Sequence, residues 1–332
     1  MIGDRSLPRA SIVIRAYNEA RHIERLLTGI CQQALNGKPV QDIEVIVVDS
    51  GSTDGTVERA RLFAAPFPIR IVHIPPEEFT FGRSLNLGIQ ASRSPLIVIA
   101  SAHVYPVYPD WLERLLAPFS DDQVVLSYGK QRGNHLSHFS EQQIFSTWYP
   151  DQTQPRQSHP FCNNANAAIR RGIWEEHPYD ESLSGLEDVE WANWAVEKGY
   201  AISYCADAVV LHIHRETPQS VFNRYRREAI AFKRIFPHQR FGKIDLGRLV
   251  SRNILSDLRQ AARQKVLLHS IGSIFWFRWM QFWGTYKGYR HSGPLTWQLR
   301  QTFYYPFDPN QAQITLSRAV EPIPYPDLEK DT

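Results

Sequence analysis

The stretch IEVIVVDSGSTDGT, residues 43–56, decides the fold class. It starts as a nearly continuous run of Val and Ile, which is typical of a strand buried on both faces of a parallel sheet. Asp49 ends this run, and Ser50, Gly51 and Ser52 allow a tight turn into a helix. In such sheets ligands bind beyond the carboxyl ends of the strands. We therefore expect Asp49 in a binding region, where its carboxylate can accept hydrogen bonds from a base or a ribose.

Similar runs alternate with helical patterns through the first 130 residues. Strands are expected at 11–17, 43–50, 69–75, 95–102 and 124–129, and helices near 19–34, 54–65, 82–93 and 110–119. This order predicts an α/β fold with a mostly parallel twisted sheet and helices on both sides. The strand ends would carry Tyr17 to Glu19, Asp49 to Gly51, and Ser101 to His103.

The remaining sequence is expected to complete this domain and to add a helical extension. A polar segment at 131–165 surrounds a helix near 138–148, and a helix at 187–199, a β-rich run at 201–214 and a basic helical stretch from Pro218 follow. Apolar residues beyond 240 recur at helical spacing. We predict one domain over residues 1–240 and a basic, aromatic-rich helical C-terminal region over 241–332.

The composition is that of a globular protein in a reducing compartment. With 332 residues and 43% hydrophobic content, the chain has enough apolar material for one large or two medium domains, which excludes disorder. Its three cysteines form no CxxC pair, so neither a disulfide scaffold nor a zinc ribbon is expected. The N-terminal residues show no signal-peptide pattern, because Arg15 interrupts the first hydrophobic run. We expect a cytoplasmic protein.

Charge is distributed unevenly along the chain. The net charge is +3, but residues 215–300 hold 17 Lys and Arg against 4 Asp and Glu, so that the rest carries −10. This segment either faces an anionic membrane surface or another polyanion, or is a solvated helical face. The eight aromatic residues between Val266 and Tyr289 form either an interfacial amphipathic helix or an aromatic core. Nucleic acid is not an expected partner.

Seven landmarks, in this order, resemble the family 2 glycosyltransferases of the GT-A fold over about residues 10–240. They are SIVIRAYNEARHIERLL, VIVVDSGSTDGT, FGRSLNLGIQAS, a strand-end triplet before PxxPDWLERLL, NNANAAIRRGIWEEHPYDES, LEDVEWANWAVEKGY and VVLHIH. The resemblance implies an inverting transferase that moves a sugar from a nucleotide sugar to a hydroxyl of a glycan or a lipid-linked glycan. Such an enzyme would serve polysaccharide or surface-glycan biosynthesis, peripherally at the inner face of the cell membrane.

The resemblance also assigns the donor site. It implies that Ala16, Tyr17, Glu19 and Asp49 hold the nucleoside of the donor. Arg83 and Asn86 would lie close to the donor phosphates or support that wall, and Ser101 stands where the family has an aspartate that helps to hold the nucleotide.

Asp188, in the pair Glu187-Asp188, corresponds to the general base of the family. A neutral hydroxyl is a poor nucleophile, and a carboxylate that takes its proton while C1 is attacked from the opposite face inverts the anomeric centre. The like charge of Glu187 can raise one pKa of the pair. The alternative is that the pair is only the acidic first turn of a helix, favoured by the helix dipole.

One landmark departs from the family pattern. Where the family has Asp-x-Asp, with a metal ligand at its last position, this chain has Ser101-Ala102-His103. Either His103 and His214, or His212 in place of His214, hold a divalent ion such as Mn²⁺, or cationic side chains neutralise the leaving group without a metal. Mg²⁺ prefers oxygen ligands, so a tight Mg²⁺ site is not expected. We predict a weak or absent metal dependence.

On the acceptor side, Asn164 and Asn166 could bind sugar hydroxyls or be turn residues, and Trp191 could stack on a sugar or belong to the core. Two other functions remain open. One is a nucleotide-sugar-binding protein of the same fold with impaired catalysis. The other is a sugar nucleotidyltransferase, disfavoured because no Gly-rich phosphate loop follows the first strand.

Overall fold

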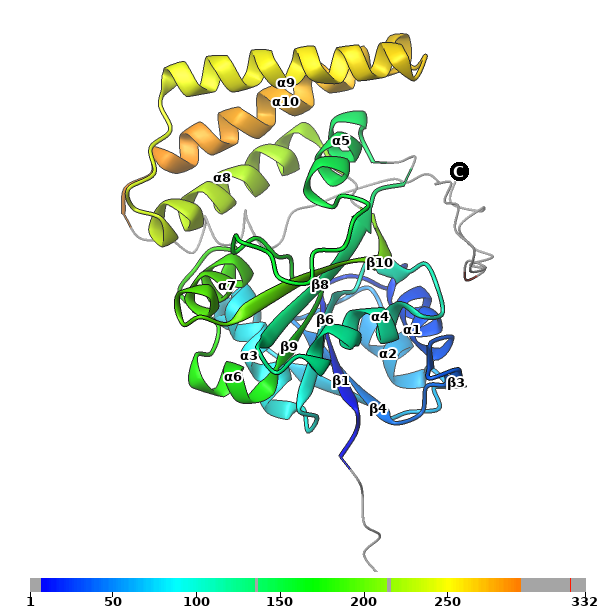
Figure 1. Ribbon diagram of the computed structural model, residues 1–332. Coiled ribbons are helices and arrows are strands. Elements are labelled where there is room, and N and C mark those ends of the chain that lie inside the picture. The colour runs from blue at the N-terminus through cyan, green and yellow to red at the C-terminus, as the bar shows by residue number, and fades with distance from the viewer. Residues whose placement is uncertain (1–6, 135–136, 214–215, 294–322, 324–332) are drawn as a thin grey trace, which may run out of the picture.

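The computed structural model describes residues 7–134, 137–213, 216–293 and 323 (Figure 1). Its centre is an eight-stranded sheet of order β5-β4-β1-β6-β9-β8-β10-β7. The strands are β1 (Ala10–Ala16), β4 (Ile43–Asp49), β5 (Ile69–His73), β6 (Leu96–Ser101), β7 (Val104–Pro106), β8 (Val124–Arg132), β9 (Asn166–Arg170) and β10 (Ala201–His212), with β2 (Ala34–Leu35) and β3 (Lys38–Pro39) as a separate hairpin.

Helices cover both faces of this sheet and one of its ends. They are α1 (Ile23–Cys31), α2 (Thr56–Leu62), α3 (Phe81–Ala91), α4 (Trp111–Leu116), α5 (Phe139–Trp148), α6 (Arg171–Glu176), α7 (Glu187–Glu197), α8 (Pro218–Ile235), α9 (Lys243–Arg263) and α10 (Leu267–Tyr289), with short 3₁₀ turns at Pro76–Glu78 and Ala117–Ser120. The predicted α/β class is confirmed, and each predicted strand and helix has a counterpart within a few residues.

The sheet is mostly parallel, as expected, with two antiparallel strands. β1 pairs in parallel with β4 and β6, and β8 pairs in parallel with β10. β9 runs antiparallel between β6 and β8, and β7 runs antiparallel to β10. Neither strand was predicted, because each is short and its pairing depends on distant parts of the chain.

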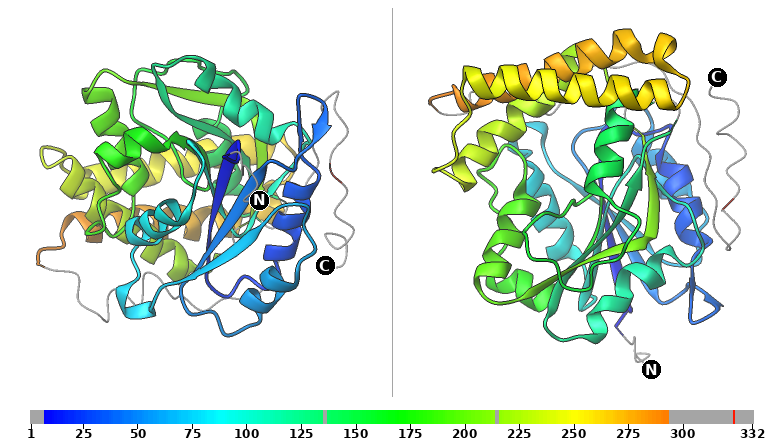
Figure 2. Two further views of the ribbon diagram at one scale, coloured as in Figure 1. Left: turned by 90° about the horizontal axis from the view of Figure 1, so that it is seen from below. Right: turned by 45° about the horizontal axis from the view of Figure 1, so that its top comes forward.

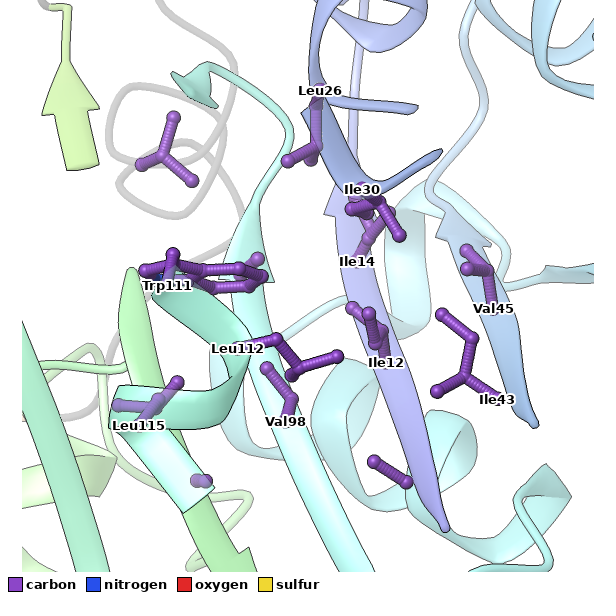
Figure 3. Close-up of a cluster of buried hydrophobic side chains, with 14 of the residues drawn as sticks. Ile12, Ile14, Leu26, Ile30, Ile43, Val45, Val98, Trp111, Leu112 and Leu115 are labelled. Carbon is purple, nitrogen blue, oxygen red and sulfur yellow. The ribbon is translucent and has the colours of Figure 1, made fainter. Parts of the chain in front are cut away.

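The core lies on both faces of the sheet. On one face, Ile12 and Ile14 of β1 point toward Leu26 and Ile30 of α1, with Trp111 of α4 beside them (Figure 3). On the other face, a second buried cluster joins the sheet to α3 and α7. The Val and Ile runs of β1, β4 and β6 are therefore buried on both sides, as their pattern indicated, whereas β5, at the edge of the sheet, is partly exposed and was wrongly expected to be buried.

The sheet curls so that its far edge returns to the end of β6. β6 ends at Ser101, and β7 begins at Val104 but pairs with β10 at the edge of the sheet. β10 permits this because its register against β8 shifts between Cys205 and Val210. As a result His212, at the end of β10, lies opposite Val104, next to the residues that follow β6.

α8, α9 and α10 form a helical layer at the end of the molecule opposite the start of β1 (Figures 1 and 2). Gly284 lets α10 approach α8 closely, since a Cβ there would lie 2.4 Å from the carbonyl oxygen of Phe222. The predicted boundary at residue 240 lies between α8 and α9, and α8 itself packs against α10 through Val221, Tyr225 and Phe277.

The aromatic stretch of residues 266–289 is partly buried and partly exposed. Ile274 and Phe277 are buried in α10, whereas Phe275 is 49% and Trp279 46% exposed. Among the described residues, no helix is long and apolar enough to span a membrane.

Candidate active site

Side chains of residues 52–56 connect the loop that follows β4 to the loop that follows β1. The backbone N–H of Asn18 donates to Ser52 Oγ (2.8 Å), and the N–H of Ala20 donates to Asp54 Oδ2 (2.9 Å). The N–H of Glu19 donates to Thr56 Oγ1 at 2.7 Å. The polar residues of the motif therefore fix the backbone of the AYNEA segment at the carboxyl edge of the sheet.

Asp49 is buried at the same edge, beside Ala16 in register. Its carboxylate accepts hydrogen bonds from the backbone N–H groups of Gly51 (3.1 Å) and Ser52 (3.3 Å), and His73 Nδ1 lies 3.5 Å away. Gly51 has a φ of 92°, which favours glycine. Asp49 thus organises the turn that it starts.

The acidic pair begins α7 and is almost fully buried. Asp188 accepts hydrogen bonds from the backbone N–H groups of Asn164 (3.0 Å) and Val189 (2.8 Å). Glu187 Oε1 lies 3.1 Å from Arg15 Nη1 and 3.4 Å from Asn164 Nδ2. Asn164 therefore contacts both carboxylates, one through its backbone and one through its side chain.

The two carboxylates differ in their surroundings. Burial, and then the like charge of Glu187, raise the pKa of Asp188 from its ordinary value of 3.8 to about 7, although two N–H donors and Arg15 act in the opposite direction. Glu187 instead has the Arg15 guanidinium as a direct partner. Asp188 is therefore the member of the pair suited to take up a proton near neutral pH.

Arg15 connects the acidic pair to the strand end that carries Asp49. It precedes Ala16 in β1, and Ala16 is in register with Asp49 of β4, while Arg15 itself is opposite Ser101 of β6. Its side chain reaches across to Glu187, so the strand ends of β4, β1 and β6 and the start of α7 meet at one edge of the sheet.

Phe81 links this edge to the helical layer. The guanidinium groups of Arg15 and of Arg227 on α8 each lie 4.7 Å from the centre of the Phe81 ring. Ser184, just before α7, donates to the carbonyl oxygen of Arg227 at 3.0 Å. α8 therefore supports the segment that carries the acidic pair.

Two histidines, His103 and His212, lie next to the end of β6, where the family pattern has the carboxylates of Asp-x-Asp. His103 Nδ1 lies 2.6 Å from Glu19 Oε1, and its ring stacks on His212 with centroids 5.1 Å apart. Burial acts to lower the pKa of His103, but the Glu19 carboxylate outweighs it and the pKa of His103 is raised. His212 Nδ1 is in turn 2.6 Å from Gln131 Oε1.

This donor set does not match an Asp-x-Asp metal site. The nitrogen of His103 that faces Glu19 is engaged by a carboxylate, and the described residues contain no group of three or more His, Cys, Asp or Glu placed to hold a metal ion. His214, predicted as a second ligand, lies outside the described residues. The described residues therefore do not reproduce the metal site of the family pattern.

Arg83 and Asn86, in the first two turns of α3, hold this helix against the segment before α7. Arg83 Nη1 is 3.2 Å from Glu181. The Asn86 side chain donates to the Tyr179 carbonyl at 2.9 Å and accepts from the Trp174 indole at 3.0 Å. These contacts hold the wall together, and a role of either residue toward the donor phosphates stays a prediction.

The predicted acceptor residues occupy different environments. Asn166 is fully buried in β9, where its amide group contacts the Trp111 indole (2.9 Å) and the Ala208 carbonyl (2.9 Å). Trp191 is fully buried in α7 and donates to the His177 carbonyl. Asn164 lies beside the acidic pair, and Asn166 pairs with Ala100 of β6, next to Ser101, with its side chain turned to buried partners.

Sequence reasoning did not assign a role to Arg15 or Phe81. For Arg15 a signal was present, because a charged residue inside a strand buried on both faces requires a partner. No comparable signal marks Phe81, since its position depends on how α3 and α8 meet.

Comparisons with known proteins agree with this geometry. The model of the protein family described as glycosyl transferase family 2 matches residues 11–177. Glycosyltransferase AglE of Haloferax volcanii is 26% identical over 223 residues, which is 67% of this chain and 72% of that protein. The O-antigen chain rhamnosyltransferase WbaN of Salmonella anatum is 29% identical over 196 residues, covering 56% of this chain and 61% of that relative.

Solved structures share the fold. The mannosyltransferase PcManGT from Pyrobaculum calidifontis, solved in complex with GDP-Man and Mn²⁺, has a TM-score of 0.58 and 20% identity, covering 86% of this chain and 85% of its own. TarS 1-349 of S. aureus in complex with UDP has a TM-score of 0.51 and 15% identity, covering 95% of this chain and 98% of its own. The expected GT-A architecture with a C-terminal helical region is confirmed.

Proposed function

Because the chain belongs to glycosyl transferase family 2 and is a glycosyltransferase, we propose that it transfers a sugar from a nucleotide sugar to a hydroxyl group of a glycan or lipid-linked glycan, with inversion at C1. The observation that carries this proposal is the contact between Arg15 and Glu187. It joins the strand ends that would bind the donor to the acidic pair, whose other member, Asp188, would activate the acceptor.

The donor would lie over the ends of β1, β4 and β6. We assign the nucleoside to Ala16, Tyr17, Glu19 and Asp49, with Ser101 close by. The backbone N–H groups of residues 18–20 donate to side chains of residues 52–56, which supports this assignment. These hydrogen bonds hold the two loops in one conformation before a ligand binds. Asp49 shapes the same region through the turn at Gly51.

Asp188 would act as the general base. Its carboxylate takes the proton of the acceptor hydroxyl while that oxygen forms a bond to C1 of the donor sugar. The bond between C1 and the diphosphate oxygen breaks on the opposite face, and the electron pair leaves with the nucleoside diphosphate. Because the pKa of Asp188 is near 7, part of the protein carries an ionised Asp188 at neutral pH. This carboxylate is also a stronger base than an ordinary aspartate.

The leaving group would be neutralised mainly by side chains of this chain. Arg15 and His103 would supply positive charge at the ends of β1 and β6, and His212, stacked on His103, would supply an N–H donor at the end of β10. A divalent ion such as Mn²⁺ would add charge neutralisation to the diphosphate when bound. Because Ser101 and His103 stand in place of two carboxylates, we propose that the dependence on a metal is weak or absent.

The acceptor is proposed to be a growing surface glycan or its lipid-linked precursor. The name of WbaN as an O-antigen chain rhamnosyltransferase supports a glycan acceptor. We place the reaction in the cytoplasm, at the inner face of the cell membrane, where the basic C-terminal helices could meet a membrane surface.

The test is a comparison of Asp188→Asn with the wild type, using thermal-shift binding of nucleoside diphosphates and transfer or hydrolysis of nucleotide sugars. We expect Asp188→Asn to lose turnover by about 10²- to 10⁴-fold while nucleotide binding is retained. Nucleotide binding without turnover in the wild type, with every donor and acceptor tried, would refute the enzymatic proposal. Full turnover in Asp188→Asn would refute Asp188 as the base.

A further inference from the structure

The outer surface of α9 and α10 carries an apolar stripe that the fold does not use. Leu268 is 94%, Ile271 42%, Phe275 49% and Trp279 46% exposed. These residues recur at intervals of three or four along α10, so they share one face of the helix. The opposite face of α10 is buried against α8 and α9 through residues such as Phe277 and Ile274.

The stripe belongs to an unusual concentration of exposed apolar side chains. Of the ten exposed large hydrophobic residues among the described ones, seven lie between residues 244 and 279. The other three, Leu7, Leu62 and Trp148, are scattered over separate elements. Isolated exposed apolar residues are normal, whereas a cluster marks an interaction surface.

The same two helices carry exposed positive charge. Eight exposed Lys and Arg side chains lie on or next to α9 and α10, and in the described residues none of them forms an ion pair. They are Lys243, Arg248, Arg252, Arg259, Arg263, Lys265, Lys287 and Arg290.

The two acidic residues of these helices are otherwise engaged. Asp245 accepts from the backbone of Gly242, and Asp257 is buried and paired with Arg278 at 2.7 Å. The charge of the exposed cations is therefore available to a partner.

We propose that this surface of α9 and α10 binds an anionic lipid bilayer at the interface between headgroups and acyl chains. Exposed Trp and Phe insert at that depth, and neighbouring Lys and Arg contact the anionic headgroups. A second copy of the chain fits less well, because it would bring two sets of cations together.

This inference deepens the proposed function and rests on it in one respect, the delivery of a lipid-linked acceptor. The helical layer lies at the end of the molecule opposite the start of β1 (Figure 1). α8 of that layer contacts the segment before Asp188 through Ser184 and Arg227. Lipid bound on α9 and α10 would thus lie on the same side of the molecule as the proposed base.

The experiment is flotation of the full chain with vesicles of phosphatidylcholine alone or mixed with phosphatidylglycerol. The apolar variant is Phe275→Ser with Trp279→Ser, and the charge variant is Arg252→Glu with Arg259→Glu. Matched controls come from α2, where Leu62 is 83% exposed and Arg61 is exposed: Leu62→Ser and Arg61→Glu. Circular dichroism and gel filtration check that each variant is folded and that its oligomeric state is unchanged.

We expect the wild type and both controls to float with the mixed vesicles, less so at high salt, and both test variants to lose about tenfold or more of that binding. Absence of wild-type binding, or binding that neither test variant weakens, overturns the proposal. A dimer of the wild type that Phe275→Ser with Trp279→Ser dissociates overturns it in favour of a second copy. Turnover on a soluble acceptor is measured in parallel, so that loss of lipid binding with intact turnover separates this surface from the proposed reaction.

Discussion

Arg15 and Glu187 are 172 residues apart in the chain, yet the Arg15 guanidinium lies 3.1 Å from the Glu187 carboxylate. Both side chains are largely buried, with 16% and 5% of their surfaces exposed. The pair places the start of α7 against the end of β1, and it distinguishes two adjacent carboxylates. Glu187 has a cation as a direct partner, whereas the Asp188 carboxylate accepts from the backbone N–H groups of Asn164 and Val189.

This arrangement predicts a pH profile with opposite shifts in two variants. Turnover at low substrate should fall as the pH drops below about 7, where Asp188 becomes protonated. Glu187→Gln should move the midpoint to lower pH, because it removes the like charge that raises the pKa of Asp188. Arg15→Gln should move it to higher pH, because Arg15 lowers that pKa.

The measurement is kcat/KM against pH, with Arg15→Lys as the control that keeps the positive charge. Arg15→Lys should leave the midpoint near that of the wild type. Equal midpoints in all four proteins would mean that another group sets the profile.

The stacked side chains of His103 and His212 lead to a prediction about turnover in the presence of a metal chelator. Turnover of the wild type should persist in excess EDTA, because Arg15, His103 and His212 are the groups we propose to neutralise the leaving group. The double variant Ser101→Asp with His103→Asp restores the Asp-x-Asp pattern, and its turnover should depend on added Mn²⁺. Complete loss of wild-type turnover in EDTA, with recovery on adding Mn²⁺, would show that this chain uses a metal after all.

Much of the fold could be predicted because its strands are long Val and Ile runs separated by helical patterns. β9 could not, because the stretch NAAIR is short, contains two alanines and acquires its antiparallel partners only in three dimensions. The same limit applies to side chains. Asp49 and Asp188 were recognisable from their motifs, whereas the burial of Asn166 and Trp191 depends on packing against Trp111 and His177.

We therefore predict that replacing Asn166 lowers the free energy of unfolding and leaves acceptor binding unchanged. Asn166→Ala removes the partners of the Trp111 indole and the Ala208 carbonyl, and each buried polar group left without a partner costs about 1–3 kcal/mol. Urea unfolding should reveal this loss, while KM for the acceptor stays unchanged in the folded protein. A raised KM with unaltered unfolding would instead place Asn166 against the acceptor.

Two glycines of α10 predict opposite effects on stability. Gly284→Ala should lower the free energy of unfolding by about 1–3 kcal/mol, because its Cβ would meet the carbonyl oxygen of Phe222. Gly272→Ala, whose Cβ would meet nothing within 4 Å, should raise it by about 0.5–1 kcal/mol, since alanine favours a helix. Equal effects of the two changes would contradict the close packing of α8 and α10.

A crystal structure of Asp188→Asn with an intact nucleotide sugar would test whether one substrate joins the ends of β1, β4 and β6 to α7. We predict that the nucleoside contacts Tyr17 and Asp49, that the diphosphate lies near His103, and that residue 188 faces the sugar on the side of C1 opposite the diphosphate. A nucleotide bound elsewhere, or a sugar that points away from residue 188, would contradict the proposed mechanism.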